Sequence, residues 1–301
     1  MPHLALSTVF YLSLATLLWA GNAIVGRALV GSISPITLSA VRWGLAACML
    51  LPFGWRVFRP SSGLWKNKGR LLVLGLLGVG SYNALLYLAL QTSTAINVTL
   101  IGASMPMWML LIGAVFYKVK PTLLQLVGAL VSLLGVTVVL TRGEPTDILS
   151  MQVVIGDLLI MLATIFWAFY SWMIGRPGES TERQWPWAEF LMAQVMIGLL
   201  WTMLFEGLEI ASGHAFIDLN LWTGALILFI ALGPSLVAYR CWGLGVSGAG
   251  PTVAAFFANL IPLFTALLSA AMLGDPPSLF HGLAFLLIAG GIIISSARQG
   301  R

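Results

Sequence analysis

Charged residues are scarce in this sequence. Asp, Glu, Lys and Arg make up only 8% of the 301 residues, whereas 59% are hydrophobic and the mean hydropathy is +0.97. An average soluble domain carries roughly 25% charged residues, and so little charge cannot cover a surface that faces water. The composition therefore argues against a soluble globular enzyme and indicates a protein whose surface contacts lipid.

Residues that bind metals or form disulfides are also few. The two cysteines, Cys48 and Cys241, both fall within apolar segments, where we expect them to pack and not to pair. The three histidines (His3, His214 and His281) are scattered and show no metal-ligand spacing. The nucleotide-binding pattern G-x-x-x-x-G-K-[ST] does not occur. We therefore expect no metal, no cofactor and no ATPase subunit.

Long apolar runs fill the chain from end to end. A helix needs about 20 apolar residues to cross a bilayer, and only helices or closed barrels satisfy their backbone in lipid. Stretches such as LLVLGLLGVGSYNALLYLAL lack the alternation of barrel strands. The sequence predicts an all-α polytopic membrane protein with ten transmembrane helices, over residues 7–29, 36–56, 71–91, 95–117, 122–141, 153–174, 187–206, 222–245, 249–273 and 279–297.

Positive charge is distributed unevenly between the two sides of this ten-helix arrangement. All but three of the 15 Lys and Arg residues fall on one side, and the exceptions are Arg27, Arg42 and Arg142. Cytoplasmic loops carry the excess of Lys and Arg, so we expect both termini to be cytoplasmic, in a bacterial cytoplasmic membrane. Basic loops beside anionic lipid also explain the pI near 9.5, and no nucleic-acid partner is needed.

Parts of the sequence occur twice. Residues 14–27 (LATLLWAGNAIVGR) resemble residues 162–176 (LATIFWAFYSWMIGR), and residues 88–106 resemble residues 244–262. We interpret 1–144 and 150–301 as two copies of a five-helix unit. Because five is odd, the second copy must enter the membrane from the opposite side. Many secondary transporters are built from such inverted repeats, with the substrate bound between them near the midplane.

Several segments carry a family resemblance. They include LATLLWAGNAIVGRAL, SPITLSAVRWGLAACMLLP and WGLGVSGAGPTVAAFFANLIPLFTALLSAAML. In these segments and their order, the chain resembles the drug/metabolite transporter superfamily, in its ten-helix EamA-domain branch. Within that branch it looks most like bacterial amino-acid and aromatic-metabolite exporters. The resemblance implies a secondary transporter that exports small amphipathic metabolites, among them aromatic amino acids. We expect it to work as a monomer.

Three tryptophans lie near the middle of their predicted helices, namely Trp19, Trp108 and Trp167. Tryptophan normally lies at the membrane interfaces, and a buried indole N–H needs an acceptor that lipid does not offer. Asn22 follows Trp19 by three residues, and Tyr170 follows Trp167 by three, so each pair shares a helix face. We expect Trp19 and Trp167 to meet between the two halves.

These observations define a set of candidate substrate-binding residues. Aromatic faces with a few hydrogen-bonding groups suit a small amphipathic solute, although each residue alone could simply pack between helices. The candidates are Trp19, Asn22, Tyr82, Asn83, Thr99, Trp108, Trp167, Tyr170 and Asn259. The tryptophans that we assign to the membrane interfaces are Trp43, Trp55, Trp65, Trp185, Trp187 and Trp222.

Prolines and charges within the membrane suggest further roles. Pro106 and Pro262 lie near the middle of the fourth and ninth helices, which they can kink, and we expect them to be hinges of a moving gate. Arg42 is the deepest cation. It could attract a substrate carboxylate, reach the outer headgroups or cap neighbouring carbonyls, and the family resemblance favours a structural role. No carboxylate is expected at mid-depth, which favours downhill transport, with coupling through another site as the alternative. Because no deep acid demands a cation and no deep cation beyond Arg42 demands an anion, we expect a zwitterionic solute.

Other functions remain open at this stage. A permease for organic cations or drugs would have the same helices, and a receptor or scaffold without transport is a second class of alternative. An intramembrane serine protease could use the Gly102-Ala103-Ser104 triplet. However, its base would have to be His281, which is expected near the outer end of the last helix. We therefore predict that the protein is not an enzyme.

Overall fold

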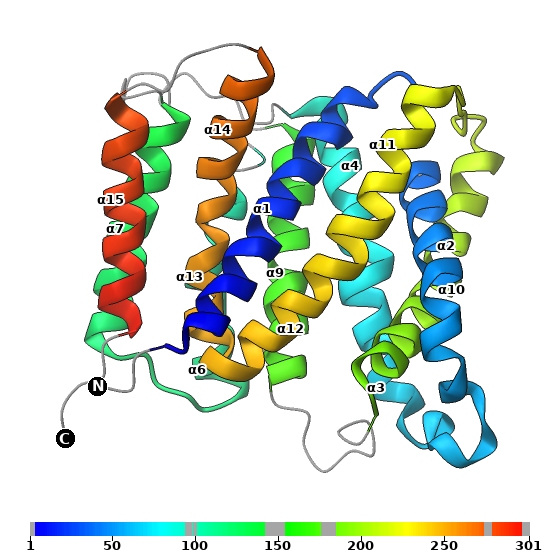
Figure 1. The fold of residues 1–301 in the computed structure, drawn as a ribbon, viewed down its shortest axis with the longest axis horizontal. Coiled ribbons are helices and arrows are strands. Elements are labelled where there is room, and N and C mark those ends of the chain that lie inside the picture. The colour runs from blue at the N-terminus through cyan, green and yellow to red at the C-terminus, as the bar shows by residue number, and fades with distance from the viewer. Residues whose placement is uncertain are drawn as a thin grey trace.

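The computed structural model describes residues 4–93, 98, 101–141, 154–175, 185–273 and 279–296. Regular structure in these residues is helical, apart from one isolated bridge between Ile33 and Ile217. The helices run between the same two ends of the molecule and form one bundle (Figure 1).

The helices of the first half are α1 (Leu6–Ala28), α2 (Pro35–Gly54), α3 (Lys68–Leu74), α4 (Tyr82–Thr92), α6 (Met105–Phe116) and α7 (Leu123–Leu140). Those of the second half are α9 (Ile155–Gly175), α10 (Trp187–Ala211), α11 (Leu221–Leu232), α12 (Ala238–Ala249), α13 (Pro251–Ala258), α14 (Leu260–Leu273) and α15 (Leu279–Ser296). Three short 3₁₀ turns between Trp55 and Asn67 connect α2 to α3.

Seven helical stretches of the described residues are long and apolar enough to cross a membrane. They are Leu6–Ala28, Pro35–Phe58, Lys68–Thr92, Ile155–Gly175, Trp187–Ala211, Leu221–Ala249 and Pro251–Leu268. Shorter apolar helices cover Met105–Phe116, Leu123–Gly135 and Gly282–Ser295. These stretches lie within or overlap the segments predicted from the sequence. The all-helical membrane fold is confirmed, and the number of ten crossings stays a prediction.

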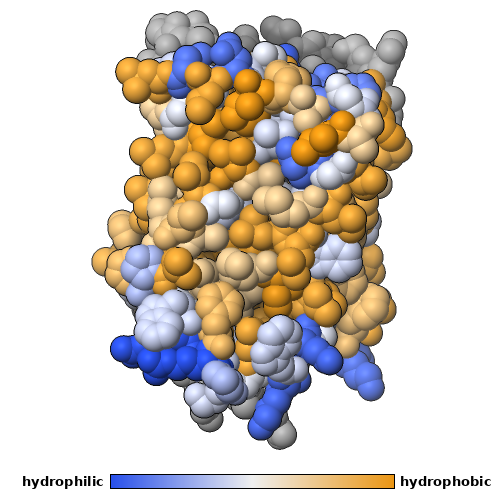
Figure 2. Space-filling model, turned by 90° about the vertical axis from the view of Figure 1, so that its right-hand side faces the viewer, coloured by the Kyte–Doolittle hydropathy of each residue, from blue (hydrophilic) through white to orange (hydrophobic). Residues whose placement is uncertain are grey.

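The surface has the polarity of a protein embedded in a bilayer. Figure 2 shows apolar residues around the middle of the molecule and hydrophilic residues at its two ends. Large apolar side chains are exposed on the bundle, for example Phe53 at 72% and Leu200 at 67%. Exposed apolar patches of this extent are unusual on soluble monomers and are covered by lipid in a multi-pass membrane protein.

One end of the bundle is basic. The connection from α2 to α3 exposes Arg56, Arg59, Lys66 and Lys68 at the lower end of Figure 1. At that same end α1 begins and α15 ends. The basic residues therefore share one end of the bundle with the first and last described helix ends, and the side of the membrane they face stays a prediction.

Two of the long helical stretches contain a π-helical segment. The segment η4 (Gly75–Ser81) separates α3 from α4, and η6 (Gly233–Val237) separates α11 from α12. Glycines let η4 pack directly on α10, because a Cβ atom at Gly75 would lie 2.8 Å from the backbone nitrogen of Gly198. Such wide turns are frequent at functional sites. They free carbonyl groups that an α-helix would use itself.

The fourth and ninth predicted helices are interrupted next to their prolines. Residues 101–102 are helical, a turn follows at 103–104, and α6 then begins with Pro106 in its first turn. In the same way α13 ends at Ala258, Asn259 forms a turn, and α14 carries Pro262 in its first turn. A proline is tolerated there because first-turn N–H groups have no partner within the helix.

Helices α7 and α15 lie side by side at one edge of the bundle, at the left of Figure 1. Small residues let their backbones approach closely. A Cβ atom at Gly291 would lie 2.6 Å from the carbonyl oxygen of Gly128 and 2.0 Å from the hydroxyl of Ser132. A Cβ atom at the neighbouring Gly290 would meet nothing within 4 Å, so only one of the two adjacent glycines is required for packing.

The substitution Gly291→Val is expected to destabilise the protein by about 2 kcal/mol, because overpacking forces the two helices apart. The thermal unfolding midpoint in detergent should fall by roughly 4 °C. The matched variant Gly290→Val adds the same side chain one residue away, and it should leave the midpoint unchanged. Equal midpoints for the two variants would contradict the packing described for α7 and α15.

Candidate functional site

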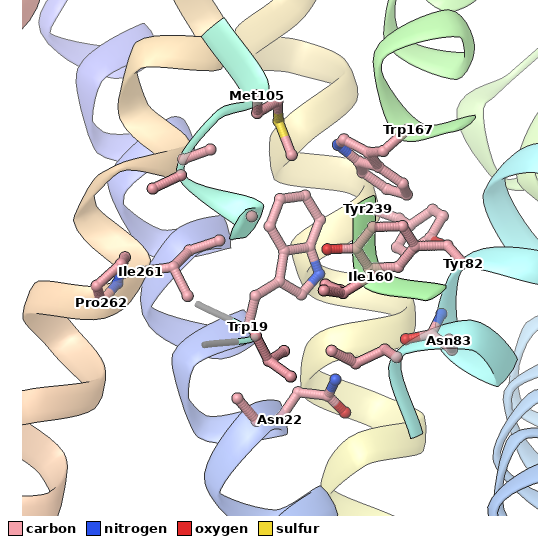
Figure 3. Close-up of a pocket in the computed structure, with 16 residues that line it drawn as sticks. Trp19, Asn22, Tyr82, Asn83, Met105, Ile160, Trp167, Tyr239, Ile261 and Pro262 are labelled. Carbon is pink, nitrogen blue, oxygen red and sulfur yellow. The ribbon is translucent and has the colours of Figure 1, made fainter. Parts of the chain in front are cut away.

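A cavity lies inside the bundle, between α1, α4, α9, α12 and the region of the α13–α14 break (Figure 3). It offers about 60 Å³ to the centres of water-sized molecules, which is room for several waters. Its polar and aromatic lining consists of Trp19, Asn22, Tyr82, Asn83, Trp167 and Tyr239. The apolar lining consists of Ala23, Leu86, Val98, Gly102, Ala103, Met105, Ile160, Ala258, Ile261 and Pro262.

Four aromatic rings from four helices gather at one side of the cavity. The rings of Trp19 and Trp167 meet edge to face, with centroids 5.1 Å apart and planes at 87°. The rings of Tyr82 and Tyr239 lie 5.0 and 5.3 Å from that of Trp167. Edge-to-face contacts of this kind are favourable. The prediction that Trp19 and Trp167 meet is confirmed.

The indole N–H groups of Trp19 and Trp242 both donate to acceptors on other helices. The indole of Trp19 donates to the carbonyl oxygen of Pro234 at 3.2 Å. Pro234 belongs to the π-helical segment η6, so its carbonyl comes from the part of the chain with irregular helical bonding. The indole of Trp242 lies 5.1 Å from that of Trp19 and donates to the Ser171 hydroxyl at 3.1 Å. Trp242 therefore packs against the Trp19 ring and is not itself among the residues that line the cavity.

Trp43 corrects one expectation from the sequence. Its place in the second predicted helix assigned it to the membrane interface, but its side chain is fully buried, at 0% exposure. Its ring lies 5.1 Å from Tyr239, and the guanidinium of Arg42 lies 5.3 Å from the ring centre. Position along a helix gave the wrong answer because it does not reveal which face of the helix turns toward the bundle interior.

Arg42 is the centre of a buried polar network. Its side chain has 0% exposure. The Nε group donates to the Ser235 hydroxyl at 2.5 Å. The Nη1 group lies within bonding distance of three oxygens, those of Asn22 at 3.0 Å, Asn83 at 2.6 Å and Tyr87 at 2.8 Å. Tyr87 in turn donates to Asn22 at 2.8 Å. The network connects α1, α2, α4 and η6.

This geometry overturns two of the roles considered for Arg42. The side chain neither extends to the headgroups nor caps carbonyls, since its acceptors are side-chain oxygens. It lies seven residues into α2, which is about 10 Å from the helix start, and it turns inward. Tyr87 and Ser235 were missed by sequence reasoning. Tyr87 could have been found, because it follows Asn83 by four residues and shares its helix face.

The other predicted site residues that the structure describes are not among those lining the cavity. Trp108 is half-buried and donates to the Ser104 hydroxyl at 3.1 Å. Asn259 is fully buried at the break between α13 and α14, and its amide has no hydrogen-bond partner among the described residues. Pro106 is buried at the start of α6. Thr99 lies outside the described residues.

A second pocket lies toward the basic end of the bundle. It offers about 210 Å³ to the centres of water-sized molecules, and its lining includes Tyr170, Gln194, Arg240 and Tyr239. Tyr239 thus borders both this pocket and the central cavity. Tyr170 lies 6.1 Å from it, ring to ring. Tyr239 therefore forms a partition between the two spaces, and Tyr170 lies beside it in the second pocket.

The partition is held by the first π-helical segment. The Tyr239 hydroxyl donates to the carbonyl oxygen of Gly78, in η4. The same glycine makes room for the other tyrosine, since a Cβ atom at Gly78 would lie 2.6 Å from the Tyr170 ring. One residue of η4 therefore positions both tyrosines.

Carboxylates in the described part of the chain lie away from the cavity. Asp157 accepts from the Ser93 hydroxyl and from the backbone N–H of Val154, at the start of α9. Glu209 accepts from the backbone N–H groups of Ile36 and Thr37 and so caps α2. A carboxylate at a helix N-terminus stabilises that helix. Both acids thus have structural partners, and neither lines the cavity.

Comparison with known proteins identifies the family. The EamA-like transporter family matches residues 6–141 and, a second time, residues 154–297. The chain belongs to the EamA-like transporter family. It is therefore a multi-pass membrane transporter, with a small-molecule substrate and the lipid bilayer as its surroundings.

Several curated relatives are similar over most of their length. The uncharacterized transporter YyaM of Bacillus subtilis is 28% identical over 268 residues, covering 89% of this chain and 86% of YyaM. An uncharacterized transporter of Archaeoglobus fulgidus is 26% identical, covering 97% of this chain and 98% of that protein. The inner membrane transporter YicL of Salmonella typhimurium, also uncharacterized, is 25% identical over 302 residues, covering 96% and 94%.

A solved crystal structure has the same fold. It superimposes with a TM-score of 0.74 over 96% of both chains, at 20% sequence identity. At this identity the likeness shows the arrangement of the helices and nothing about the solute. The solute must therefore be inferred from the side chains that line the cavity.

The partition at Tyr239 can be tested by thiol labelling in detergent. Ala258 lines the cavity and is buried, so Ala258→Cys reports on it once Cys48 and Cys241 have been replaced by alanine. Tyr239→Ala joins the two spaces and should speed labelling about tenfold, which corresponds to roughly 1.4 kcal/mol of barrier. Tyr239→Phe keeps the ring and should label slowly. Equal rates for these two variants would show that Tyr239 is not the partition.

Proposed function

We propose that this EamA-like transporter exports small amphipathic metabolites, most of all amino acids including aromatic ones, through the central cavity. The observation that carries the proposal is the combined lining of aromatic rings and side-chain amides. Trp19 and Trp167 come from the middle parts of α1 and α9, where a substrate site is expected in secondary transporters. Rings can cover an apolar body, and amides can bind polar groups.

The mechanism we propose is alternating access between two inverted repeats, 1–144 and 150–301. The double family match supports it, as do the π-helical segments η4 and η6 and the helix breaks beside Pro106 and Pro262. When residues 88–106 are aligned with 244–262, η4 aligns with η6 and Pro106 aligns with Pro262. Two similar halves can exchange conformations at similar energy, and this opens the site to either side.

The proposal also includes an orientation in the membrane and a set of moving helices. The basic end of the bundle is placed in the cytoplasm, with both termini, in a bacterial cytoplasmic membrane. The partition at Tyr239 then closes the cavity toward the cytoplasm, and the pocket that contains Arg240 is the inner entrance. The helices that begin beside Pro106 and Pro262 are the moving elements. The protein works as a monomer, and solute concentration sets the direction of net flux.

A permease for organic cations is a second candidate, favoured by the ring cluster itself. Aromatic faces attract flat or quaternary cations. The rings of Trp19, Tyr82 and Tyr239 lie 5.0 to 5.3 Å from that of Trp167 and resemble such a site. The two functions differ in the charge of the solute. A panel that includes both zwitterions and cations therefore separates them.

The amino-acid proposal predicts counterflow in proteoliposomes. Vesicles loaded with unlabelled phenylalanine or threonine should accumulate the labelled amino acid, and empty vesicles should not. The variants Trp19→Ala and Trp167→Ala remove the rings that line the cavity and should reduce the initial rate about tenfold or more. Trp222→Ala is the matched control, because that side chain is 65% exposed, and its rate should equal that of the parent.

Two outcomes of the counterflow experiment would change the proposal. Exchange of tetraethylammonium but of no amino acid would replace it with the organic-cation permease, and exchange of no solute would favour a receptor or scaffold. A pH gradient should leave the rate unchanged, since none of the described residues that line the cavity is an acid. A strong dependence on the gradient would refute downhill transport.

The hinge role of the prolines predicts a kinetic effect without loss of folding. The double variant Pro106→Ala/Pro262→Ala restores two N–H groups that can extend the helices across the breaks, and it should slow counterflow about fivefold or more. Pro52→Ala changes a proline within α2 and serves as the control, with the rate of the parent. If the double variant also transports at the parent rate, Pro106 and Pro262 are not hinges.

A further inference from the structure

The charge of Arg42 is not neutralised by any partner that the structure gives it. All four of its hydrogen bonds end on uncharged oxygens, those of Asn22, Asn83, Tyr87 and Ser235. Its Nη2 group is buried and has no hydrogen-bond partner among the described residues. An ionised side chain in the membrane interior is costly to bury and marks functional sites. The network thus holds a positive charge for which the described part of the chain supplies no counter-ion.

The orientation of two amide groups follows from this charge. A guanidinium has donors and no acceptor, so the amide atom that faces Arg42 must be oxygen, in both Asn22 and Asn83. The NH₂ group of each asparagine is therefore turned away from Arg42. Both residues line the cavity, and Figure 3 shows their amides at its lower edge. The Nδ2 atom of Asn83 is buried, lies near the Tyr239 hydroxyl, and makes no hydrogen bond of standard geometry among the described residues.

The cavity wall formed by the two asparagines is thus suited to an acceptor with negative charge. It presents N–H donors, and a guanidinium lies one hydrogen bond behind them. Buried donors without acceptors are unfavourable, and hydrogen bonds to a charged acceptor are the stronger ones. The rings of Trp19 and Trp167 also line the cavity and present apolar faces to it. An organic cation would meet the repulsion of Arg42 in a site of low dielectric constant.

We propose that the central cavity binds its solute by a carboxylate group, which accepts hydrogen bonds from the amides of Asn22 and Asn83 in front of Arg42. The apolar part of the solute then lies against the two indoles. The inference rests on the proposed function, since it names the group by which that site selects an amino acid. Arg42 is a positioning residue, because it orients the two asparagine amides and supplies a positive electrostatic potential behind them.

Solutes that share one shape and differ in charge test the proposal in proteoliposomes. The set is phenylalanine, phenylalaninamide, phenethylamine and 3-phenylpropionate, each used to drive or to inhibit counterflow, with threonine and threoninamide as a smaller pair. Solutes with a carboxylate should exchange about tenfold or more faster than the amide and the amine. Equal exchange of phenylalanine, its amide and the amine would overturn the carboxylate proposal and leave the transport function intact.

The variant Asn83→Asp places a negative charge beside Arg42 while keeping the shape of the side chain. The new carboxylate lies where the Asn83 oxygen accepts at 2.6 Å, so it pairs with the guanidinium and supports folding. The preference for phenylalanine over phenethylamine should fall about tenfold or more. Asn22→Asp is the second variant, with the same expectation. A merely structural role of Arg42 predicts lower stability with an unchanged preference, which would contradict the proposal.

Asn220→Asp is the matched control. Asn220 is exposed, and its side chain caps α11 by accepting from the backbone N–H of Thr223, a task that Asp performs equally well. Its solute preference should equal that of the parent. If neither the parent nor this control exchanges any solute of the set, the proposed transport function fails as well. The two failures are therefore distinguishable.

Discussion

The rest of the structure depends on the lack of hydrogen-bond partners in the bilayer. Each polar group within the helical bundle must find its partner inside the protein. Arg42 meets this requirement through Nε and Nη1, which lie within bonding distance of four side-chain oxygens from other helices, whereas Nη2 has no partner among the described residues. The network therefore fixes how α1, α2, α4 and η6 lie relative to one another. It does so at the wall of the cavity, where the same groups are available to a solute.

Irregular helix geometry is the second means by which the chain provides polar groups at depth. The π-helical segments present the carbonyl groups of Gly78 and Pro234, which receive the Tyr239 hydroxyl and the Trp19 indole. Regular α-helices would use those carbonyls in their own bonds. Glycine is needed in η4 for a separate reason, namely space for the Tyr170 ring. The aromatic cluster and the unusual turns thus form one arrangement.

Much of the architecture could be predicted from the length of apolar segments alone. The bilayer sets that length, and the observed helices follow the predicted segments closely. The meeting of Trp19 and Trp167 could be predicted from the repeated phrase in which both occur. Asn22 and Asn83 were candidates because polar side chains at mid-depth need a reason to be there.

The sequence pattern could not supply the neighbours of a side chain across the bundle. Several contacts at the site join residues far apart in the chain. They are the contact of Trp43 with Tyr239, the bond from Arg42 to Ser235 and the contacts that make Tyr239 a partition. Periodicity gives a helix face but not the helix that this face meets. The π-helical segments were also missed, since GLLGVGS is as apolar and glycine-rich as several regular helical stretches.

The bonds from Trp19 to Pro234 and from Tyr239 to Gly78 are reciprocal. Each runs from an aromatic side chain of one half to an irregular turn of the other, and Gly78 corresponds to Pro234 in the register that aligns the two halves. The two halves are thus joined by a pair of hydrogen bonds that run in opposite directions. Each bond contributes about 1 kcal/mol net to stability. This is only about twice the thermal energy, so either bond can break while the other is kept. Breaking one bond leaves the packing of η4 on α10 and of α4 on α9 in place, so the molecule can become asymmetric without coming apart.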